Sequence, residues 1–502
     1  MTTIPLFELR KIIPRWRDSN SALQTGELIS SNSKAHQNKV GHELFAEKLL
    51  LWRKQGLIEY AAEVVSSAIS QGFINEAIDA AEFLISESAK TTPAVIFIAN
   101  EVLVRTQKKI KGVVNIANLI ENNRITIYKR IHRLRRLLID YPRNALMWTD
   151  LSLFYIKIGQ FQQSIDAMSA ALFLAPDNRF VLRSATRMFI HIGEPDRAHK
   201  LLINKPVTRQ DPWLLAAEIA TAGVANKPPS FVRFGKEILE TQKYSTFHTG
   251  ELASAIATLE LSYGSLRKAR KLFQSSLFDP TENSVAQSVW AKKQIPFLDT
   301  DSVLQTTPRT YEARAMNALR DLNWEEAIQE SQLWLADEFF SSRPAEVASF
   351  AALIGLENYS LSEELIKAAL IANPDDLTLI NNLAFSIASQ DRAYEARNIL
   401  DDAINKIEGA NDNVPIKATM GLIKIRSGEV DAGKALYLEA ISLAQHRSNI
   451  EQAALASIYY AREMLLAGMF TKTEAITIAE VAAETCPYPH IIWLLEKVKA
   501  IS

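Results

Sequence analysis

The chain has 502 residues and a mass of 56.2 kDa, which is too much for one hydrophobic core and requires several domains or a long repeat array. Its 48% apolar residues and net charge of −1 exclude a largely disordered protein. The single cysteine, Cys486, excludes an internal disulfide framework, and no apolar run is long enough for a membrane span. We therefore expect a cytoplasmic protein without membrane attachment, and the scarcity of Gly and Pro favours helices.

Residues 1–45 are expected to form a partly irregular lead-in. Glu8, Arg10 and Lys11 interrupt the stretch in which a signal peptide needs an apolar core, so we do not expect export.

A basic segment follows between Arg105 and Arg143, with eleven basic and two acidic residues. Within it, apolar residues at helical spacing, from Ile127 to Leu138, predict a helix with a basic opposite face. Two readings stay open. The face is either a solvated outer surface or a site for phosphate or an acidic partner, because the arginine fork suits both ligands. The residues of this possible patch are Arg124, Lys129, Arg130, Arg133 and Arg136.

The stretch 145–178 has the pattern of one helix–turn–helix unit. Its marker residues are Trp148, Leu151, Tyr155, Gly159, Ser164, Met168, Ala171 and Pro176. The three large residues share one face of a first helix, and Gly159 is suited to the left-handed conformation that ends it. The small residues allow close packing of a second helix, which Pro176 ends.

The same frame returns along the chain at the same pitch. Gly193 and Ala198 repeat the turn and the small residue after thirty-four positions, and further copies fall in 343–445 and 454–486. These residues resemble those of tetratricopeptide-repeat proteins, whose repeat is 34 residues.

The resemblance implies an all-α protein, an α-solenoid of stacked helix–turn–helix repeats wound into a right-handed superhelix, because one hairpin cannot bury its apolar face alone. We expect an N-terminal array over 46–285, an irregular connection over 286–310 with three prolines in and near it, and a C-terminal array over 311–502. One continuous superhelix is the alternative.

Charge is distributed unevenly along this array. Nineteen acidic and seven basic residues lie between Tyr311 and Asp412, opposite in sign to the basic segment. Because each repeat of a solenoid contacts its neighbours, we expect the two segments to lie far apart in space.

The inner face, lined by the first helix of each unit, is where a peptide or helix is expected to bind. Residues at groove positions are candidates for holding a partner. They are Lys157, Arg183, Arg187, His191, Asn381, Asn382 and Phe385.

Motifs for chemistry are missing from the sequence. Neither a glycine-rich phosphate loop nor a zinc-protease helix occurs, and Cys486 with His490 falls in a proline-bracketed turn. We therefore expect no enzyme, no catalytic or metal-binding residues and no cofactor.

The favoured function is a cytosolic scaffold or adaptor that binds a partner protein or peptide on its concave face. The alternative is a subunit that contacts nucleic acid, or an enzyme acting on it, through the basic segment 105–143 and its arginine-rich helix over 124–143.

Overall fold

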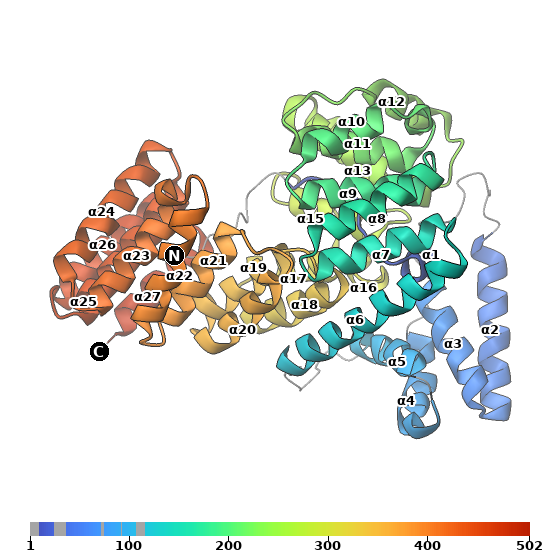
Figure 1. The fold of residues 1–502 in the computed structure, drawn as a ribbon, viewed down its shortest axis with the longest axis horizontal. Coiled ribbons are helices and arrows are strands. Elements are labelled where there is room, and N and C mark those ends of the chain that lie inside the picture. Colours follow the sequence, from blue (N-terminus) through green and yellow to red (C-terminus); the bar gives the residue numbers. More distant parts are fainter. Residues whose placement is uncertain (1–9, 25–36, 72–74, 92, 107–115, 502) are drawn as a thin grey trace.

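Antiparallel pairs of α-helices form the architecture of the protein (Figure 1). The computed structural model describes residues 10–24, 37–71, 75–91, 93–106 and 116–501, and these ranges contain no β-strand. The all-α solenoid of stacked hairpins that the tetratricopeptide resemblance implies is therefore confirmed.

Six helices precede the main array within the described residues, and four of them form a small group of their own. The six are α1 (Ser19–Gln24), α2 (Gln37–Gln55), α3 (Ile58–Gln71), α4 (Ile78–Ser86), α5 (Pro93–Thr106) and the long α6 (Ile116–Asp140). Helices α2 to α5 share a core that includes Phe45, Val64 and Leu84, and they hang below the main array in Figure 1. Helix α6 leads from this group into the array.

Ten helices then follow in the N-terminal half of the array. They are α7 (Ala145–Lys157), α8 (Phe161–Leu174), α9 (Arg179–His191), α10 (Pro195–Ile203), α11 (Pro212–Val224), α12 (Val232–Thr241), α13 (Thr246–Tyr263), α14 (Leu266–Ser276), α15 (Glu282–Ala291) and α16 (Asp301–Thr306).

The C-terminal half continues in the same way. Its helices are α17 (Tyr311–Arg320), α18 (Trp324–Asp337), α19 (Arg343–Phe350), α20 (Tyr359–Leu370), α21 (Leu377–Ala388), α22 (Ala393–Lys406), α23 (Val414–Arg426), α24 (Val430–His446), α25 (Ile450–Leu466), α26 (Lys472–Thr485) and α27 (Pro489–Ala500).

Local sequence explains where the hairpins begin and turn. Several first helices start after a capping side chain that accepts a backbone N–H: Asn144, Asn178, Asp211, Thr281, Asp376 and Asn413. Gly159 has φ +72° at the end of α7, as its place in the pattern predicts. Ser164 is buried, and its Oγ lies 2.8 Å from that of Ser152, which joins the two helices of the first hairpin.

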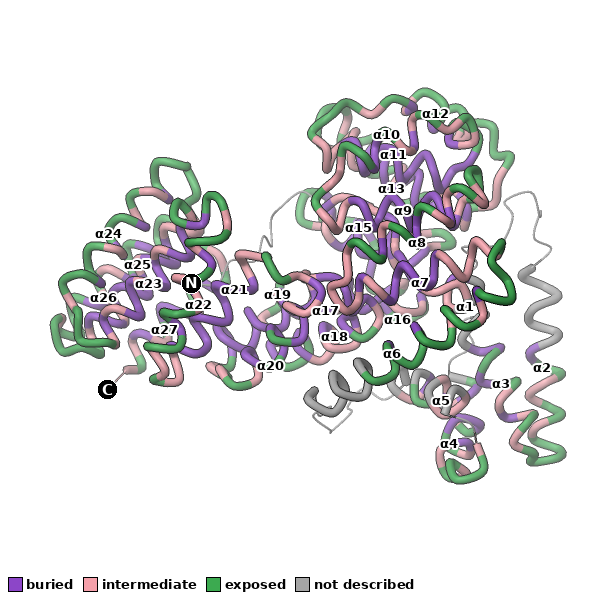
Figure 2. The backbone as a smooth tube through the Cα atoms, viewed as in Figure 1, coloured by how far each residue is buried: buried purple, intermediate pink, exposed green. Residues whose placement is uncertain are grey.

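The odd-numbered helices from α7 to α27 form one continuous row, because each contacts the next. Figure 2 shows buried residues following this row. The row crosses 286–310, where α15 continues into the stretch and α16 lies within it. Pro280 and Pro296 stand between helices and Pro308 follows α16, so they separate helices without breaking the stack. The division into two arrays stays a prediction.

The array winds far enough to contact itself. A Cβ added to Gly159 would lie 2.5 Å from the backbone oxygen of Ile371, so the first hairpin closely approaches the end of α20. Helix α6 also contacts α20. The expectation that the basic and acidic segments lie far apart is therefore wrong for these helices, because a superhelix brings distant repeats together after a turn.

Candidate functional site

An extended segment of the chain, residues 10–18, lies inside the array. It has no regular secondary structure and leads directly into α1. Ile12 is 2% exposed and Trp16 1%, and Arg10 and Arg17 are also buried. This segment belongs to the stretch expected to be a partly irregular lead-in. It is irregular in conformation, but it is enclosed by helices that come much later in the sequence.

Two side-chain amides of α15 bind the backbone of this segment. Asn283 Nδ2 donates to the carbonyl oxygen of Ile13 at 2.9 Å, and Gln287 Nε2 donates to that of Arg10 at 2.8 Å. Asn283 and Gln287 are four residues apart and share one helix face. Their amide oxygens also accept from the guanidinium of Arg10, at 2.8 Å for Asn283 and 2.7 Å for Gln287. The two amides therefore fix the register of the segment through its backbone and also bind one of its arginines.

Three arginines of the segment pair with carboxylates of the array. Arg10 binds Glu312 through two N–H groups, at 2.9 and 2.7 Å, in the two-pronged geometry that makes such pairs strong. Arg15 contacts both Glu312 and Glu338. We name these ion pairs, together with those of Arg17 with Glu282 and Asp337, the arginine–carboxylate ladder.

Arg17 is the last arginine of the ladder and binds two carboxylates. Its guanidinium donates to Asp337 Oδ2 at 2.7 Å and to Glu282 Oε1 at 2.8 Å. The carboxylates of the ladder thus come from α15 (Glu282), from α17 (Glu312) and from the end of α18 (Asp337 and, just after it, Glu338). Helices α17 and α18 pack as one hairpin, and α15 contacts α17 beside it.

The charges of the ladder shift the pKa values of its acids. Burial alone would raise the pKa of Glu312, but the attraction of Arg10 and Arg15 outweighs burial and lowers it well below its usual range. The pKa of Asp337 is lowered in the same way, since Arg17 and Arg309 outweigh its burial. Both groups are ionised at neutral pH.

The apolar side chains of the segment pack into hydrophobic cores of the array. Ile12 belongs to a core with residues of α11 and α13, among them Ile219 and Leu252. Trp16 belongs to a second core with residues of α7, α8 and α9, and its ring meets that of Phe340 edge-on at 5.6 Å.

The far end of the segment is tied to α7. Asp150 accepts hydrogen bonds from the backbone N–H and the hydroxyl of Ser19, at 2.7 and 2.6 Å. Burial raises the pKa of Asp150 to about 7, with a smaller contribution from Asp18, although the bonds from Ser19 and the charge of Arg130 oppose it.

Arg183, predicted at a groove position, lies behind this site. It is 3% exposed and donates to Glu251 at 2.9 Å, and Glu251 in turn accepts from Asn283 at 3.2 Å. Its guanidinium also lies 4.5 Å from the ring centre of Trp213. Arg183 thus acts on the segment through Glu251 and Asn283.

Arg187 and His191, from the same predicted face of α9, surround Phe340. The Arg187 guanidinium lies 4.7 Å from the ring centre of Phe340, and the His191 ring meets that ring edge-on at 5.4 Å. Burial and the charge of Arg187 lower the pKa of His191 to about 3, so its ring is neutral near neutral pH. His191 Nε2 lies 3.1 Å from the carbonyl oxygen of Ala372.

Lys157 also faces the segment from α7. Burial lowers its pKa, while the charges of Asp18 and Asp337 oppose that effect. The structure therefore brings Lys157, Arg183, Arg187 and His191 around one site, as packing and positioning residues.

Asn381, Asn382 and Phe385 lie elsewhere, on α21, and all three are buried. Asn382 donates to Ser349 Oγ at 3.3 Å, and the ring of Phe385 meets that of Tyr459 edge-on at 5.2 Å. These side chains join neighbouring hairpins. Their role in binding a partner stays a prediction.

The basic helix α6 has the two faces that its sequence predicts. Ile127, Ile131 and Leu138 are buried, and the basic residues of the opposite face are exposed: Lys129, Arg130, Arg133 and Arg136. Arg130 lies 3.4 Å from Asp18, at the end of the bound segment. The side chain of Arg124 and residues 107–115 of the basic segment lie outside the described residues.

The described ranges also bear on metal binding, membrane spans and nucleophilic side chains. Within those ranges no cluster of three or more His, Cys, Asp or Glu is arranged to hold a metal ion, and no helix there is long and apolar enough to span a membrane. Cys486 is fully buried and burial raises its thiol pKa, whereas a nucleophile needs a lowered one.

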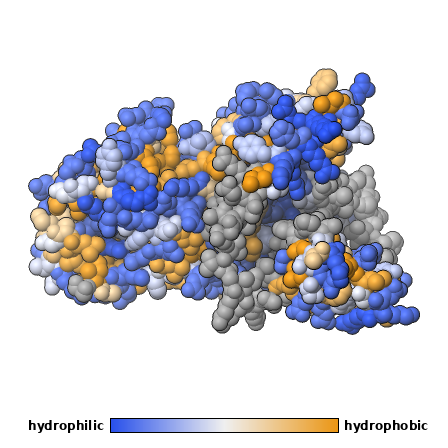
Figure 3. Space-filling model, turned by 60° about the horizontal axis from the view of Figure 1, so that its bottom comes forward, coloured by the Kyte–Doolittle hydropathy of each residue, from blue (hydrophilic) through white to orange (hydrophobic). Residues whose placement is uncertain are grey.

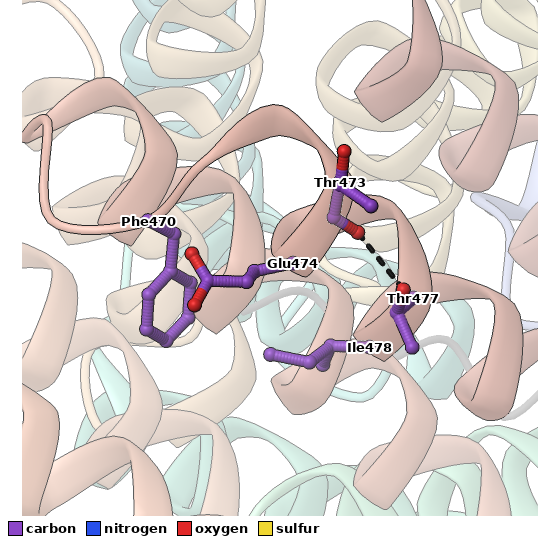
Figure 4. A pocket seen from close by; sticks show the side chains of 5 residues that line it. All are labelled: Phe470, Thr473, Glu474, Thr477 and Ile478. Atoms are coloured by element: carbon purple, nitrogen blue, oxygen red, sulfur yellow. Dashed lines mark hydrogen bonds between the residues drawn. The ribbon is translucent and has the colours of Figure 1, made fainter.

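A shallow cavity of about 320 Å³ lies against α26, between Phe470, Glu474 and Ile478 (Figure 4). Glu474 is held by Thr471 in a capping box, and the Thr477 hydroxyl donates to the backbone of Thr473, so the side chains of Glu474 and Thr477 are already paired. In Figure 3 hydrophobic side chains on the described surface are interspersed with hydrophilic ones. The groove around residues 10–18 is therefore the candidate site.

Sequence reasoning missed the residues that bind the segment. Asn283 and Gln287 stand in a stretch that keeps the repeat pitch poorly, so their groove position was not recognised. A signal was present in the segment itself, where Ile12, Pro14 and Trp16 alternate with other residues, as in an extended chain with one buried face.

The sequence matches no protein-family model and no curated protein. Solved structures with a similar overall fold include the human IFIT1 dimer with m7Gppp-AAAA, at 11% identity and a TM-score of 0.35, over 74% of this chain and 94% of that one. The APC/C hetero-tetramer Cut9-Hcn1 has 13% identity and a TM-score of 0.38, and the match covers 95% of this chain and 97% of that one. Yeast Tom70 has 12% sequence identity and a TM-score of 0.33, and the match covers 96% of each chain. At such values we draw no functional conclusion from them.

Proposed function

We propose that this chain is a non-enzymatic, cytoplasmic scaffold that binds an extended segment of a partner protein in the groove of its helical array. One observation carries the proposal: the groove already holds an extended peptide, residues 10–18, whose backbone is bound by Asn283 and Gln287. Side-chain amides that bind main-chain oxygens suit a groove for polypeptide, because every peptide offers such oxygens.

The test uses the full chain with a protease site inserted between α1 and α2. Cleavage leaves the segment bound but no longer tethered, so the array is not first unfolded by truncation. A labelled synthetic peptide with the sequence of residues 10–18 is then added, and its binding is followed by fluorescence anisotropy. We expect saturable binding of one peptide per chain as the cleaved fragment leaves.

The control variants separate the groove from the rest of the surface. The double variant Asn283→Ala/Gln287→Ala should bind the peptide more weakly. Gln163→Ala, at an exposed position of α8, should leave peptide binding unchanged. A cleaved chain that stays helical but never exchanges its fragment for added peptide would show that the segment is a fixed part of the fold, and the proposal would fail.

A second candidate function rests on α6. Lys129, Arg133 and Arg136 make no ion pair with a residue of the described ranges, so their charges are available to phosphate. This supports contact with nucleic acid. Binding of a labelled single-stranded RNA should fall steeply with added salt and should be lost in Arg130→Ala/Arg133→Ala/Arg136→Ala. Unchanged binding by that triple variant would rule out this role for α6.

A further inference from the structure

The groove around residues 10–18 is acidic where the arginines enter it. Glu282, Glu312, Asp337 and Glu338 converge on Arg10, Arg15 and Arg17. Each of these carboxylates is at least 85% buried at its side chain. Other cations also stand near these carboxylates. Arg309 lies 3.6 Å from Asp337, Arg343 attracts Glu312, and Arg187 interacts with Glu338 and Glu312.

An empty groove would leave these carboxylates without the closest of their cations, Arg10, Arg15 and Arg17. Buried charges of one sign repel one another and lose their hydration, so the groove needs a cationic occupant to keep them ionised. The same charges exclude polyanions: phosphate in this groove would face four carboxylates. The occupant that fits is therefore a peptide and not a nucleic acid.

The carboxylates of the ladder favour arginine over lysine, although both side chains carry a positive charge. Glu312 receives two parallel N–H groups from Arg10, and the guanidinium of Arg17 spans Asp337 and Glu282. A planar fork with five donors satisfies such sets, whereas the ammonium of lysine is a compact point charge. Register comes from the amides that bind the carbonyl oxygens of Arg10 and Ile13, and from the core around Trp16.

Building on the proposed function, we infer that the partner of the groove carries an extended segment with arginines at relative positions 1, 6 and 8 and a tryptophan or similar large apolar residue at position 7. Residues 10–18 are the chain's own copy of this ligand. A partner must displace them to bind.

The tether makes this copy a strong competitor. A ligand that belongs to the same chain as its site competes without the entropic cost of bringing in a second molecule, at an effective concentration set by the connection. Ser19 and Asp150 add a second attachment at the end of the segment. In the intact chain the groove is therefore closed to weak ligands, and it opens when the segment is cut or out-competed.

Peptide variants on the cleaved chain test the inference. The probe is the synthetic peptide of residues 10–18, compared with versions in which its three arginines are replaced by lysine or by glutamine. Since each change leaves buried carboxylates unpaired, we expect binding to weaken about tenfold or more with lysine and at least about 100-fold with glutamine. The intact chain should bind every peptide much more weakly than the cleaved one.

A double-mutant cycle locates the effect. Peptide Arg17→Gln and protein Asp337→Asn should each weaken binding, and together they should cost less than the product of the two, because they remove the same pair. Glu325→Gln, at an exposed position of α18, is the matched control and should change nothing.

Three results would overturn the inference, and they are distinct from failure of the proposed function. If the glutamine peptide binds as tightly as the parent, the groove holds peptides without selecting arginine, and the proposed function survives alone. If the intact and cleaved chains bind the peptide equally, residues 10–18 do not compete. If mixing two labelled copies of the intact chain yields dimers with exchanged segments, the occupant is a second copy and not a partner protein.

Discussion

Arg10 and Glu312 are 302 residues apart in sequence and form a two-pronged ion pair, with donor–acceptor distances of 2.9 and 2.7 Å. The pair joins the beginning of the described chain to the middle of the helical array. Glu312 also forms an ion pair with Arg15, so a single carboxylate binds two cations of the segment.

Replacing Glu312 tests how much this pair contributes to stability. Glu312→Gln keeps the size of the side chain but leaves the buried Arg10 without its anion and Arg15 with Glu338 alone, so we expect the free energy of unfolding to fall by about 3–5 kcal/mol. Urea denaturation followed by circular dichroism measures the change. Glu325→Gln, an exposed change on α18, should stay within about 0.5 kcal/mol of the parent. Equal losses in the two variants would contradict the assignment.

The packing of Trp16 gives a second prediction. Its side chain is 1% exposed and lies in the core of the first hairpins. Trp16→Ala should therefore lower the free energy of unfolding by about 3–5 kcal/mol, the range for large aromatic residues removed from a core. Phe173→Ala, at a residue that is 85% exposed, is the control and should have little effect. A Trp16→Ala protein as stable as the control would mean that the segment does not pack as described.

His191 predicts a loss of stability in mild acid. Its pKa is about 3 in the folded chain, below the value of about 6.5 in an unfolded one, so the unfolded state binds the proton more tightly. The contribution is fully present above pH 6.5 and is lost as the pH falls, by about 2 kcal/mol between pH 7 and pH 5.

The variant His191→Gln, whose amide can still donate to Ala372, should lose this part of the pH dependence. His132→Gln on the exposed face of α6 is the control and should keep it. Denaturation curves at several pH values measure both. A pH dependence that is unchanged in His191→Gln would place its origin elsewhere.

Asp150 predicts an effect of opposite sign at its own site. Its pKa is about 7 when it holds Ser19, and lower when the carboxyl is solvated, so the attached state retains the proton better. The groups that face it are Asp18, Arg130 and Lys157. Raising the pH from 6 to 8 should weaken the attachment about tenfold, or about 1.4 kcal/mol.

The rate or extent of fragment release from the cleaved chain measures this attachment. Asp150→Asn carries no charge and should make release independent of pH over this range, whereas Asp140→Asn, at an exposed position, should not. Release that grows as the pH falls from 8 to 6 would be the wrong sign and would refute the prediction.

The sequence by itself determined the helical hairpins and their stacking. Gly159, Ser164 and the capping residues act within one unit or between neighbours, so their effect follows from local spacing. The same local periodicity placed Arg183, Arg187 and His191 on one face of α9 and gave α6 a buried and a basic side.

Only the tertiary structure decided what lies in the groove. Asn283, Glu312 and Asp337 stand on three helices, α15, α17 and α18, and they meet Arg10, Ile13 and Arg17 because the array encloses an extended segment from the other end of the described chain. Local pattern could not supply this, since the superhelical winding sums small rotations over many repeats, and the contacts it produces join residues hundreds of positions apart.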